Sequence, residues 1–151
     1  SIDAMKLLKN QGIKARWYVL GEGELREKLQ EKIHKLGLDK EFILLGATAN
    51  PYPYYAQCDL YVHATRFEGK SIAVEEAQIL GKVIVASDCT GNAEQIISEY
   101  DGILLPLSAE RLASEIMRVL DDKQLQKKLS ENVLKKNFNH DEDMQKLLTL
   151  L

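Results

Sequence analysis

Two glutamates, Glu68 and Glu76, stand eight positions apart on either side of a run of small and polar residues. A buried strand is predicted before this run and a helix within it, so backbone N–H groups at the helix start would face an anion. Carboxylates accept hydrogen bonds from neighbouring hydroxyl groups. The spacing therefore predicts a site for a ligand with both phosphates and hydroxyls, and a nucleotide-sugar has both.

The residues beside the two glutamates have separate expected parts. The helix start would act through its backbone N–H groups, and Ser71 would also cap the helix. Apolar residues at positions 72, 73 and 77 favour an inward position for Glu76. Its neighbour Glu75 lies on another helix face and is expected in solvent. Lys70 has two equally good interpretations, a phosphate contact or a solvated lysine.

Glycines at two other strand ends are also candidates. Gly21 and Gly23 do not complete a dinucleotide-binding G-x-G-x-x-G motif, because Arg26 occupies the last position. They are interpreted as a turn, and Gly21 is expected at the edge of the ligand cleft. Gly46 ends a strand on the same side and either faces the nucleotide base or only closes the turn.

Histidine and tyrosine side chains near the predicted cleft have two interpretations each. His63 ends a strand, where a satisfied histidine at the rim of the site is commoner than a catalytic one. Tyr52, Tyr54 and Tyr55 either stack on a base or, the preferred interpretation, pack a short amphipathic helix. Glu94 is interpreted as an acid that favours the first turn of its helix rather than as a ligand.

The order of apolar runs predicts how these residues are positioned. Mainly apolar runs, typical of strands buried on both faces, occur at 15–20, 42–46, 59–63, 83–86 and 102–106. Helical spacing predicts helices at 2–10, 25–36, 54–57, from the acidic loop to Leu80, and at 90–98, 108–120, 121–138 and 141–151. Alternating strands and helices predict an α/β fold, a parallel sheet with helices on both faces.

Composition limits the class of protein. The 151 residues are 45% hydrophobic and 28% charged with a net charge of −3, ordinary for one globular domain and without the basic excess of nucleic-acid binders. No apolar run reaches the roughly 20 residues of a membrane span. Cys58 and Cys89 are predicted at opposite sheet edges, as free thiols in a reducing, cytoplasmic compartment. No His/Cys/Asp cluster has the spacing of a metal site.

The ordered set of motifs resembles the C-terminal domain of retaining GT-B glycosyltransferases of family 4 (glycosyl transferases group 1). The segment at 19–25 resembles the family's Val-x-Gly-x-Gly-x-Leu turn, and Glu68 to Glu76 matches its E-x7-E motif. Further matches follow in order at 44–46, 59–62, 81–87, 91–94 and 102–106. The resemblance covers essentially the whole chain.

The resemblance implies a fold, an activity and site residues. The fold would be the Rossmann-like C-terminal half of a GT-B enzyme, and residues 1–151 one nucleotide-sugar-binding domain whose first strand precedes Ser1. The parent would transfer a hexose with retention from UDP- or GDP-hexose to a sugar or lipid-linked acceptor held by an N-terminal domain, in polysaccharide or glycolipid synthesis. It would need no metal and lie in the cytoplasm, peripheral at the inner membrane face, and the isolated chain would be inactive. Glu68 would be catalytic beside the donor sugar and Glu76 would bind the ribose; the remaining donor-binding positions would be Gly69, Lys70, Ser71, Ile72, Ala73, Gly21 and Gly46.

The chain also departs from the family pattern. Lys70-Ser71 replaces the usual Phe-Gly, and Ala64-Thr65 replaces Pro-Ser. The family's diphosphate-binding Arg and Lys precede the first helix, upstream of Ser1. These departures keep an alternative open, a non-catalytic nucleotide-binding or interaction domain of the same fold. A sugar-nucleotide epimerase of this fold would use a catalytic pattern that is not found here.

Overall fold

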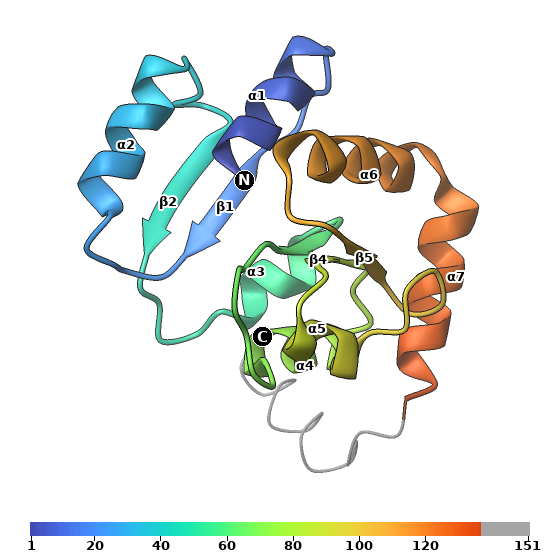
Figure 1. Cartoon of the computed structure of the whole chain (residues 1–151). Helices are drawn as coiled ribbons and strands as arrows, with labels where there is room; N and C mark the ends of the chain where they lie inside the picture. The colour runs from blue at the N-terminus through green and yellow to red at the C-terminus, as the bar shows by residue number, and fades with distance from the viewer. Residues whose placement is uncertain (137–151) are drawn as a thin grey trace.

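Helices alternate with strands along residues 1–136, the part of the chain that the computed structural model describes (Figure 1). The helices are α1 (Ile2–Asn10), α2 (Arg26–Lys35), α3 (Tyr52–Gln57), α4 (Ile72–Ile79), α5 (Thr90–Gln95), α6 (Ala109–Asp121) and α7 (Lys123–Leu134). The strands are β1 (Trp17–Leu20), β2 (Phe42–Gly46), β3 (Tyr61–His63), β4 (Ile84–Ser87) and β5 (Ile103–Leu105). Every strand lies within two residues of a predicted one.

All paired strands are parallel, as the apolar runs predict, and they form two sheets. β1 pairs with β2, and β3, β4 and β5 form a three-stranded sheet in that order. Among the described strands, β1 and β3 are each hydrogen-bonded on one side only. Helices lie beside both sheets (Figure 1). The predicted α/β class is therefore confirmed, with the strands divided between two sheets where one was expected.

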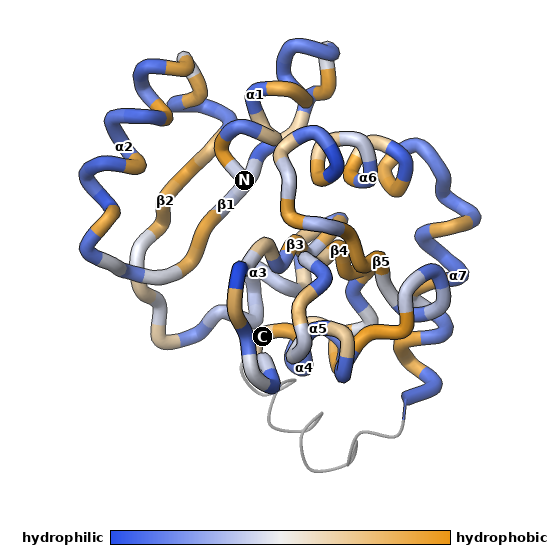
Figure 2. Tube along the Cα trace, in the orientation of Figure 1, coloured by the Kyte–Doolittle hydropathy of each residue, from blue (hydrophilic) through white to orange (hydrophobic). Residues whose placement is uncertain are grey.

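The central strand β4 shows why helices cover both faces of the larger sheet. All four of its residues are buried. Val85 faces the larger hydrophobic cluster, which includes residues of α1 and α6, whereas Ile84 and Ala86 face a second cluster with Val74 and Ala77 of α4. Successive strand residues point to opposite faces, so one strand serves two cores. Apolar residues follow the strands in Figure 2, while α2 is mainly hydrophilic.

Several helix ends differ from the sequence prediction because side chains cap them. The predicted helix at 121–138 begins as a separate helix after Asp122, whose carboxylate accepts the Leu125 N–H at 2.9 Å, and ends at Leu134. The helix at 90–98 ends early, at Gln95, because the Asp101 carboxylate accepts the Ile97 N–H at 2.8 Å. The short helix predicted at 54–57 begins two residues earlier. The prediction at 141–151 lies outside the described residues.

Parallel strands bring all their carboxyl ends to one side of each sheet. The connections that leave these ends begin at residues 21, 47, 64, 88 and 106. Crevices outside the carboxyl ends of such strands are the usual ligand sites of open α/β sheets. The acidic loop between β3 and α4 is one of these connections.

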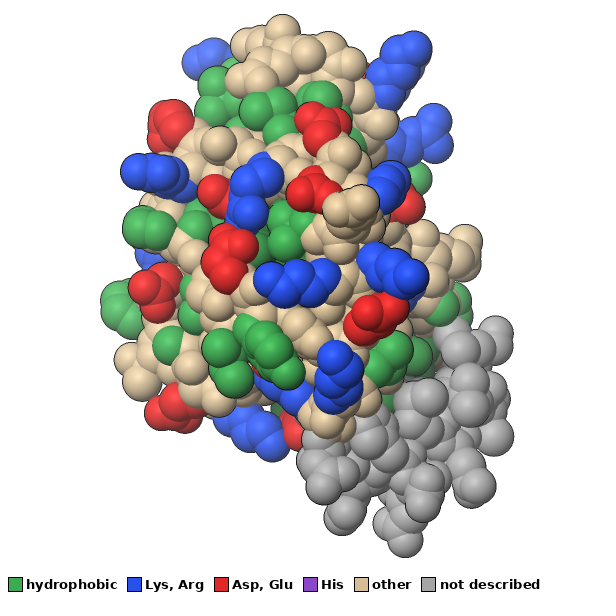
Figure 3. Space-filling model, turned by 90° about the vertical axis from the view of Figure 1, so that its right-hand side faces the viewer, with side chains coloured by type: hydrophobic (Ala, Val, Ile, Leu, Met, Phe, Trp, Pro, Cys, Tyr) green, Lys and Arg blue, Asp and Glu red, His purple; other side chains and the backbone are tan. Residues whose placement is uncertain are grey.

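The two cysteines are free, as predicted. The Cys58 thiol donates to the Tyr55 carbonyl oxygen at 3.2 Å, and burial raises its pKa. Within residues 1–136, no helix is both long enough and apolar enough to cross a membrane. On the side where α7 lies, acidic and basic side chains are interspersed (Figure 3), and Arg118 pairs with Glu99 at 2.6 Å.

Candidate functional site

Glu68 is held at the carboxyl end of β3 by the last residue of that strand. His63 Nε2 lies 3.0 Å from Glu68 Oε2, and its Nδ1 lies 3.0 Å from the Tyr61 hydroxyl. The side chains of His63 and Glu68 are 17% and 30% exposed. The interpretation of His63 as a satisfied histidine at the rim of the site fits this geometry, and its partner is the first glutamate of the motif.

The start of α4 is fixed by its cap and by α5. Ser71 is 5% exposed, and its hydroxyl accepts the Val74 N–H, as predicted for an N-cap. Gln95 brackets the Ser71 backbone: its Oε1 accepts the Ser71 N–H at 2.7 Å and its Nε2 donates to the Ser71 carbonyl at 3.0 Å. The Ser71 amide therefore already has a partner. In the described part of the chain, the amides of Ile72 and Ala73 have none and remain the free donors of the helix start.

The loop that carries Glu68 packs directly against α5 at Gly91. A Cβ atom built on Gly91 would lie 1.8 Å from the Gly69 carbonyl oxygen and 2.5 Å from that of Glu68. Only hydrogen fits in this contact, because real Cβ atoms essentially never approach other heavy atoms within 3.0 Å. Gly91 therefore sets how closely the Glu68 loop approaches α5.

The second glutamate of the motif has a phenol partner. The Tyr52 hydroxyl of α3 donates to Glu76 Oε1 at 2.9 Å, which raises the pKa of Tyr52. Burial raises the pKa of Tyr55 and raises that of Tyr61 to about 12. Tyr55 and Tyr61 pack edge to face with ring centroids 5.3 Å apart. The packing interpretation therefore fits Tyr52 and Tyr55, and Tyr52 also orients Glu76. It does not fit Tyr54, whose side chain is 43% exposed.

Gly21 and Gly46 meet at the carboxyl ends of β1 and β2. The Gly21 N–H donates to the Gly46 carbonyl at 2.8 Å. Gly46 has a φ of +89°, a backbone conformation that glycine adopts far more readily than other residues. The chain then runs from Gly46 into α3 and so to Tyr52, the partner of Glu76. The described contacts form two groups, one around these glycines and one around Glu68.

The exposed residues around the motif differ in whether their side chains have partners. Lys70 pairs with Glu75 at 3.0 Å, and their side chains are 67% and 32% exposed. Glu75 is therefore in contact with solvent, as expected, and also forms an ion pair. Ile72 is 72% exposed, which corrects the expectation that its side chain helps to form an inward apolar face for Glu76. Ala77 is buried as expected. Phe67, directly before Glu68, is 90% exposed.

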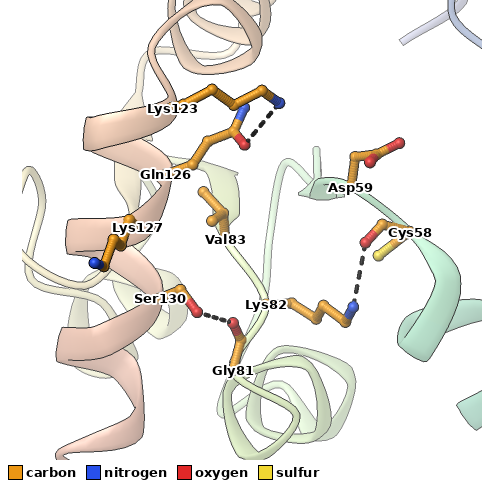
Figure 4. Close-up of a pocket in the computed structure, with 9 residues that line it drawn as sticks. All are labelled: Cys58, Asp59, Gly81, Lys82, Val83, Lys123, Gln126, Lys127 and Ser130. Atoms are coloured by element: carbon orange, nitrogen blue, oxygen red, sulfur yellow. Dashed lines mark hydrogen bonds between the residues drawn. The ribbon is translucent and has the colours of Figure 1, made fainter.

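A concavity lies at the amino-terminal ends of β3 and β4, opposite the strand ends that carry Glu68 (Figure 4). Its volume is about 330 Å³, and its lining includes three lysines. Lys82 donates to the carbonyls of Ala56 and Cys58, and Lys123 donates to Gln126 Oε1 at 3.1 Å. It contains neither glutamate of the motif. Across residues 1–136, no group of three His, Cys, Asp or Glu side chains could hold a metal.

Comparison with known proteins decides the family. The family model described as "Glycosyl transferases group 1" matches residues 1–136. The chain belongs to this glycosyltransferase family. The match includes both glutamates, the histidine at the end of β3 and the α5 contacts, so the group around Glu68 is part of a glycosyltransferase domain.

Individual relatives of this group 1 domain are longer proteins. N-acetylgalactosamine-N,N'-diacetylbacillosaminyl-diphospho-undecaprenol 4-alpha-N-acetylgalactosaminyltransferase of Campylobacter jejuni is 31% identical over 111 residues, covering 72% of this chain and 30% of that protein. HepE of Anabaena, crystallised with UDP-glucose, is 26% identical with a TM-score of 0.81, covering 99% of this chain and 44% of that one. The C-terminal domain of LpcC from Francisella tularensis is 26% identical with a TM-score of 0.70, covering 88% of this chain and 73% of that one. The likeness in structure confirms the Rossmann-like fold of one half of a GT-B enzyme.

Three contacts of the site were not predicted from the sequence. Gly91 was recognised only as part of a motif, and Gln95 had no signal at all. His63 was recognised as near the cleft, but its bond with Glu68 was not. A glycine at the second position of a helix that follows a buried strand is the one local signal that points to a close backbone approach.

Proposed function

We propose that this chain is the C-terminal, donor-binding part of a retaining glycosyltransferase of family 4 that transfers a hexose from UDP- or GDP-hexose. The observation that carries the proposal is the geometry of the two glutamates. Each has an oxygen held by a neighbouring side chain, His63 or Tyr52, on either side of the start of α4. Two oriented carboxylates around free helix N–H groups suit a ligand with a diphosphate between two sets of hydroxyls.

In this proposal the site residues act in three groups. Glu68 is the catalytic residue beside the donor sugar, and Glu76 accepts hydrogen bonds from the ribose. The diphosphate lies at the α4 start, with Gly69 and Ser71 shaping the loop and Ile72 and Ala73 supplying backbone N–H groups. Lys70 adds a positive charge from the rim of the site. Gly21 and Gly46 line the far edge of the cleft.

Catalysis would come from positioning and from charge stabilisation of the leaving diphosphate. The helix start contributes about 0.3–1 kcal/mol per charge. We assign no metal to the site; further cations would come from the chain upstream of Ser1. With an α-linked donor such as UDP-glucose, retention is supported by the Campylobacter relative, whose name describes an α-glycosyl transfer. The HepE structure with UDP-glucose supports a UDP-sugar as the first donor to test.

The rest of the enzyme is part of the same proposal. One further parallel strand, upstream in the parent sequence, would lie between β1 and β3 and join the two sheets into the single sheet that the sequence predicts. β1 and β3 each have an edge unpaired within the described fold, as β2 and β5 also do. An N-terminal domain would hold the acceptor, and the chain covers only 30% of the Campylobacter relative. That relative's name contains an undecaprenol diphosphate, which supports a lipid-linked acceptor at the inner membrane face and cytoplasmic synthesis of a glycolipid or polysaccharide. The isolated chain would bind donor weakly and transfer nothing.

The alternative function is a nucleotide-binding domain without catalysis. It keeps the same ligand and the same Glu76 contact but gives Glu68 no reacting sugar. A parent protein that binds a nucleotide-sugar and neither hydrolyses nor transfers it would support this alternative.

Ligand-observed NMR of the 151-residue chain tests the proposed donor site. The probes are UDP, GDP, ADP, UDP-glucose and GDP-mannose. We expect one nucleotide to bind, Glu76→Ala to abolish its binding, and Glu68→Gln to weaken only the nucleotide-sugar. Glu31→Ala, at an exposed position of α2 away from the α4 start, is the control and should bind like the wild type. Absence of binding both here and in a chain extended upstream would refute the donor site.

A further inference from the structure

His63 lies at the centre of a hydrogen-bonded row of side chains. Its Nδ1 is 3.0 Å from the Tyr61 hydroxyl, and its Nε2 is 3.0 Å from Glu68 Oε2 and 3.4 Å from Ser71 Oγ. The Tyr61 and His63 rings stack at 5.9 Å between centroids. The imidazole is thus fixed in its plane and at both nitrogens, on the strand that ends beside the acidic loop.

The chemistry of the partners assigns the proton on the ring. An ionised carboxylate only accepts hydrogen bonds, so the nitrogen that faces Glu68 must carry the hydrogen. The neutral imidazole has one N–H, which leaves Nδ1 as an acceptor for the Tyr61 O–H. The Tyr61 hydroxyl remains protonated at neutral pH because burial raises its pKa to about 12. The Tyr61 hydroxyl therefore donates to His63 Nδ1, and His63 Nε2–H donates to the Glu68 carboxylate.

We propose that His63 is a positioning residue for Glu68, with Tyr61 setting its tautomer and with Nε2–H fixing one oxygen of the carboxylate. The bond leaves Oε1 of Glu68 as the oxygen for the donor sugar, since no other described residue bonds it. This role rests on the proposed function of Glu68. Ser71 contributes a second oxygen near Nε2, one that the glycine usual at this position could not supply.

The tautomer can be measured without any ligand. Nitrogen-15 NMR of the imidazole side chains at pH 8 should show His63 protonated at Nε2 and unprotonated at Nδ1. The spectrum of His63→Gln identifies its signals among those of the three histidines. Glu68→Ala should shift the Nε2 signal and Tyr61→Phe the Nδ1 signal. A His63 protonated at Nδ1, or signals unmoved by Glu68→Ala, would overturn the proposal.

The effect of His63 on donor binding is measured as the ratio of the affinities for UDP-glucose and for UDP. In His63→Phe, which keeps a ring without a donor, the affinity for UDP-glucose should fall about fivefold while that for UDP is unchanged, the loss expected for one hydrogen bond. His63→Gln places an amide N–H near the Nε2 position and should restore the ratio to within about twofold. A merely structural role for His63 would instead lower both affinities together.

Failure of the proposed donor site and failure of the positioning role of His63 would give different results. If neither UDP, GDP nor their sugars bind the wild-type chain or its upstream extension, the proposed donor site fails, and the nitrogen-15 spectrum still decides the bond from His63 to Glu68. If UDP-glucose binds and His63→Phe leaves the ratio of affinities unchanged, the donor site stands and the positioning role is refuted.

Discussion

The contact between Gly91 and the Glu68 loop leads to a prediction about stability in which helix propensity and packing have opposite effects. Gly91→Ala adds one methyl group inside α5, and alanine in place of a helical glycine normally stabilises by up to about 1 kcal/mol. The structure predicts the reverse. The new Cβ would lie 1.8 Å from the Gly69 carbonyl oxygen, well inside the 3.0 Å limit.

The expected magnitude follows from that distance. The loop and α5 must separate by at least about 1.2 Å, and such overpacking costs about 1–3 kcal/mol. The shift moves Glu68 away from its bond with His63. Losing that one hydrogen bond should lower the affinity for UDP-glucose about fivefold, with a smaller effect on UDP.

Urea unfolding of Gly91→Ala, with UDP and UDP-glucose titrations, checks this prediction. Gly23→Ala is the matched control, because a Cβ on Gly23 has nothing within 4 Å. The control should change the free energy of unfolding by less than about 0.5 kcal/mol. A Gly91→Ala chain that is as stable as the wild type and binds UDP-glucose equally well would refute the packing argument.

Three further predictions concern stability. Burial raises the pKa of Tyr55, so the unfolded chain loses this proton first, and the free energy of unfolding should fall above about pH 10 by about 1.4 kcal/mol per pH unit. Urea unfolding of Tyr55→Phe should show a weaker decline, and equal slopes would contradict this. Asp101 is 0% exposed and pairs with Lys136 at 2.7 Å. Asp101→Ala removes one half of this ion pair and should lower the free energy of unfolding by about 3 kcal/mol. A loss below about 1 kcal/mol in urea unfolding would contradict this. Ser108→Ala removes the cap of α6 and should cost about 1 kcal/mol in thermal unfolding. Ser114→Ala, at an exposed position inside the same helix, is the control and should cost less than about 0.5 kcal/mol.

Local patterns in the sequence were sufficient for the class of the fold. Mainly apolar runs identified the five strands of the described part, because a strand covered on both faces needs apolar side chains on both. Only β4 is fully buried; Tyr18 of β1 and Leu45 of β2 are 47% and 38% exposed. Periodicity does not encode which strand edges pair, and so the division into two sheets was not predicted. Caps were predicted where Ser71 and Ser108 stood before a helix, but the break at Asp122 was missed because helical spacing continues across it.

The sequence by itself determined that this protein has parallel α/β layers, with Glu68 and Glu76 flanking a helix start at the carboxyl ends of its strands. That information is local, since each element depends on side chains three or four positions apart. Only the tertiary structure decided that His63 orients Glu68, that Gln95 brackets Ser71, and that Gly91 admits the loop. These contacts depend on strand register and on how α4 and α5 pack together, and a hydrogen bond requires positions correct to a few tenths of an ångström, which periodicity cannot specify.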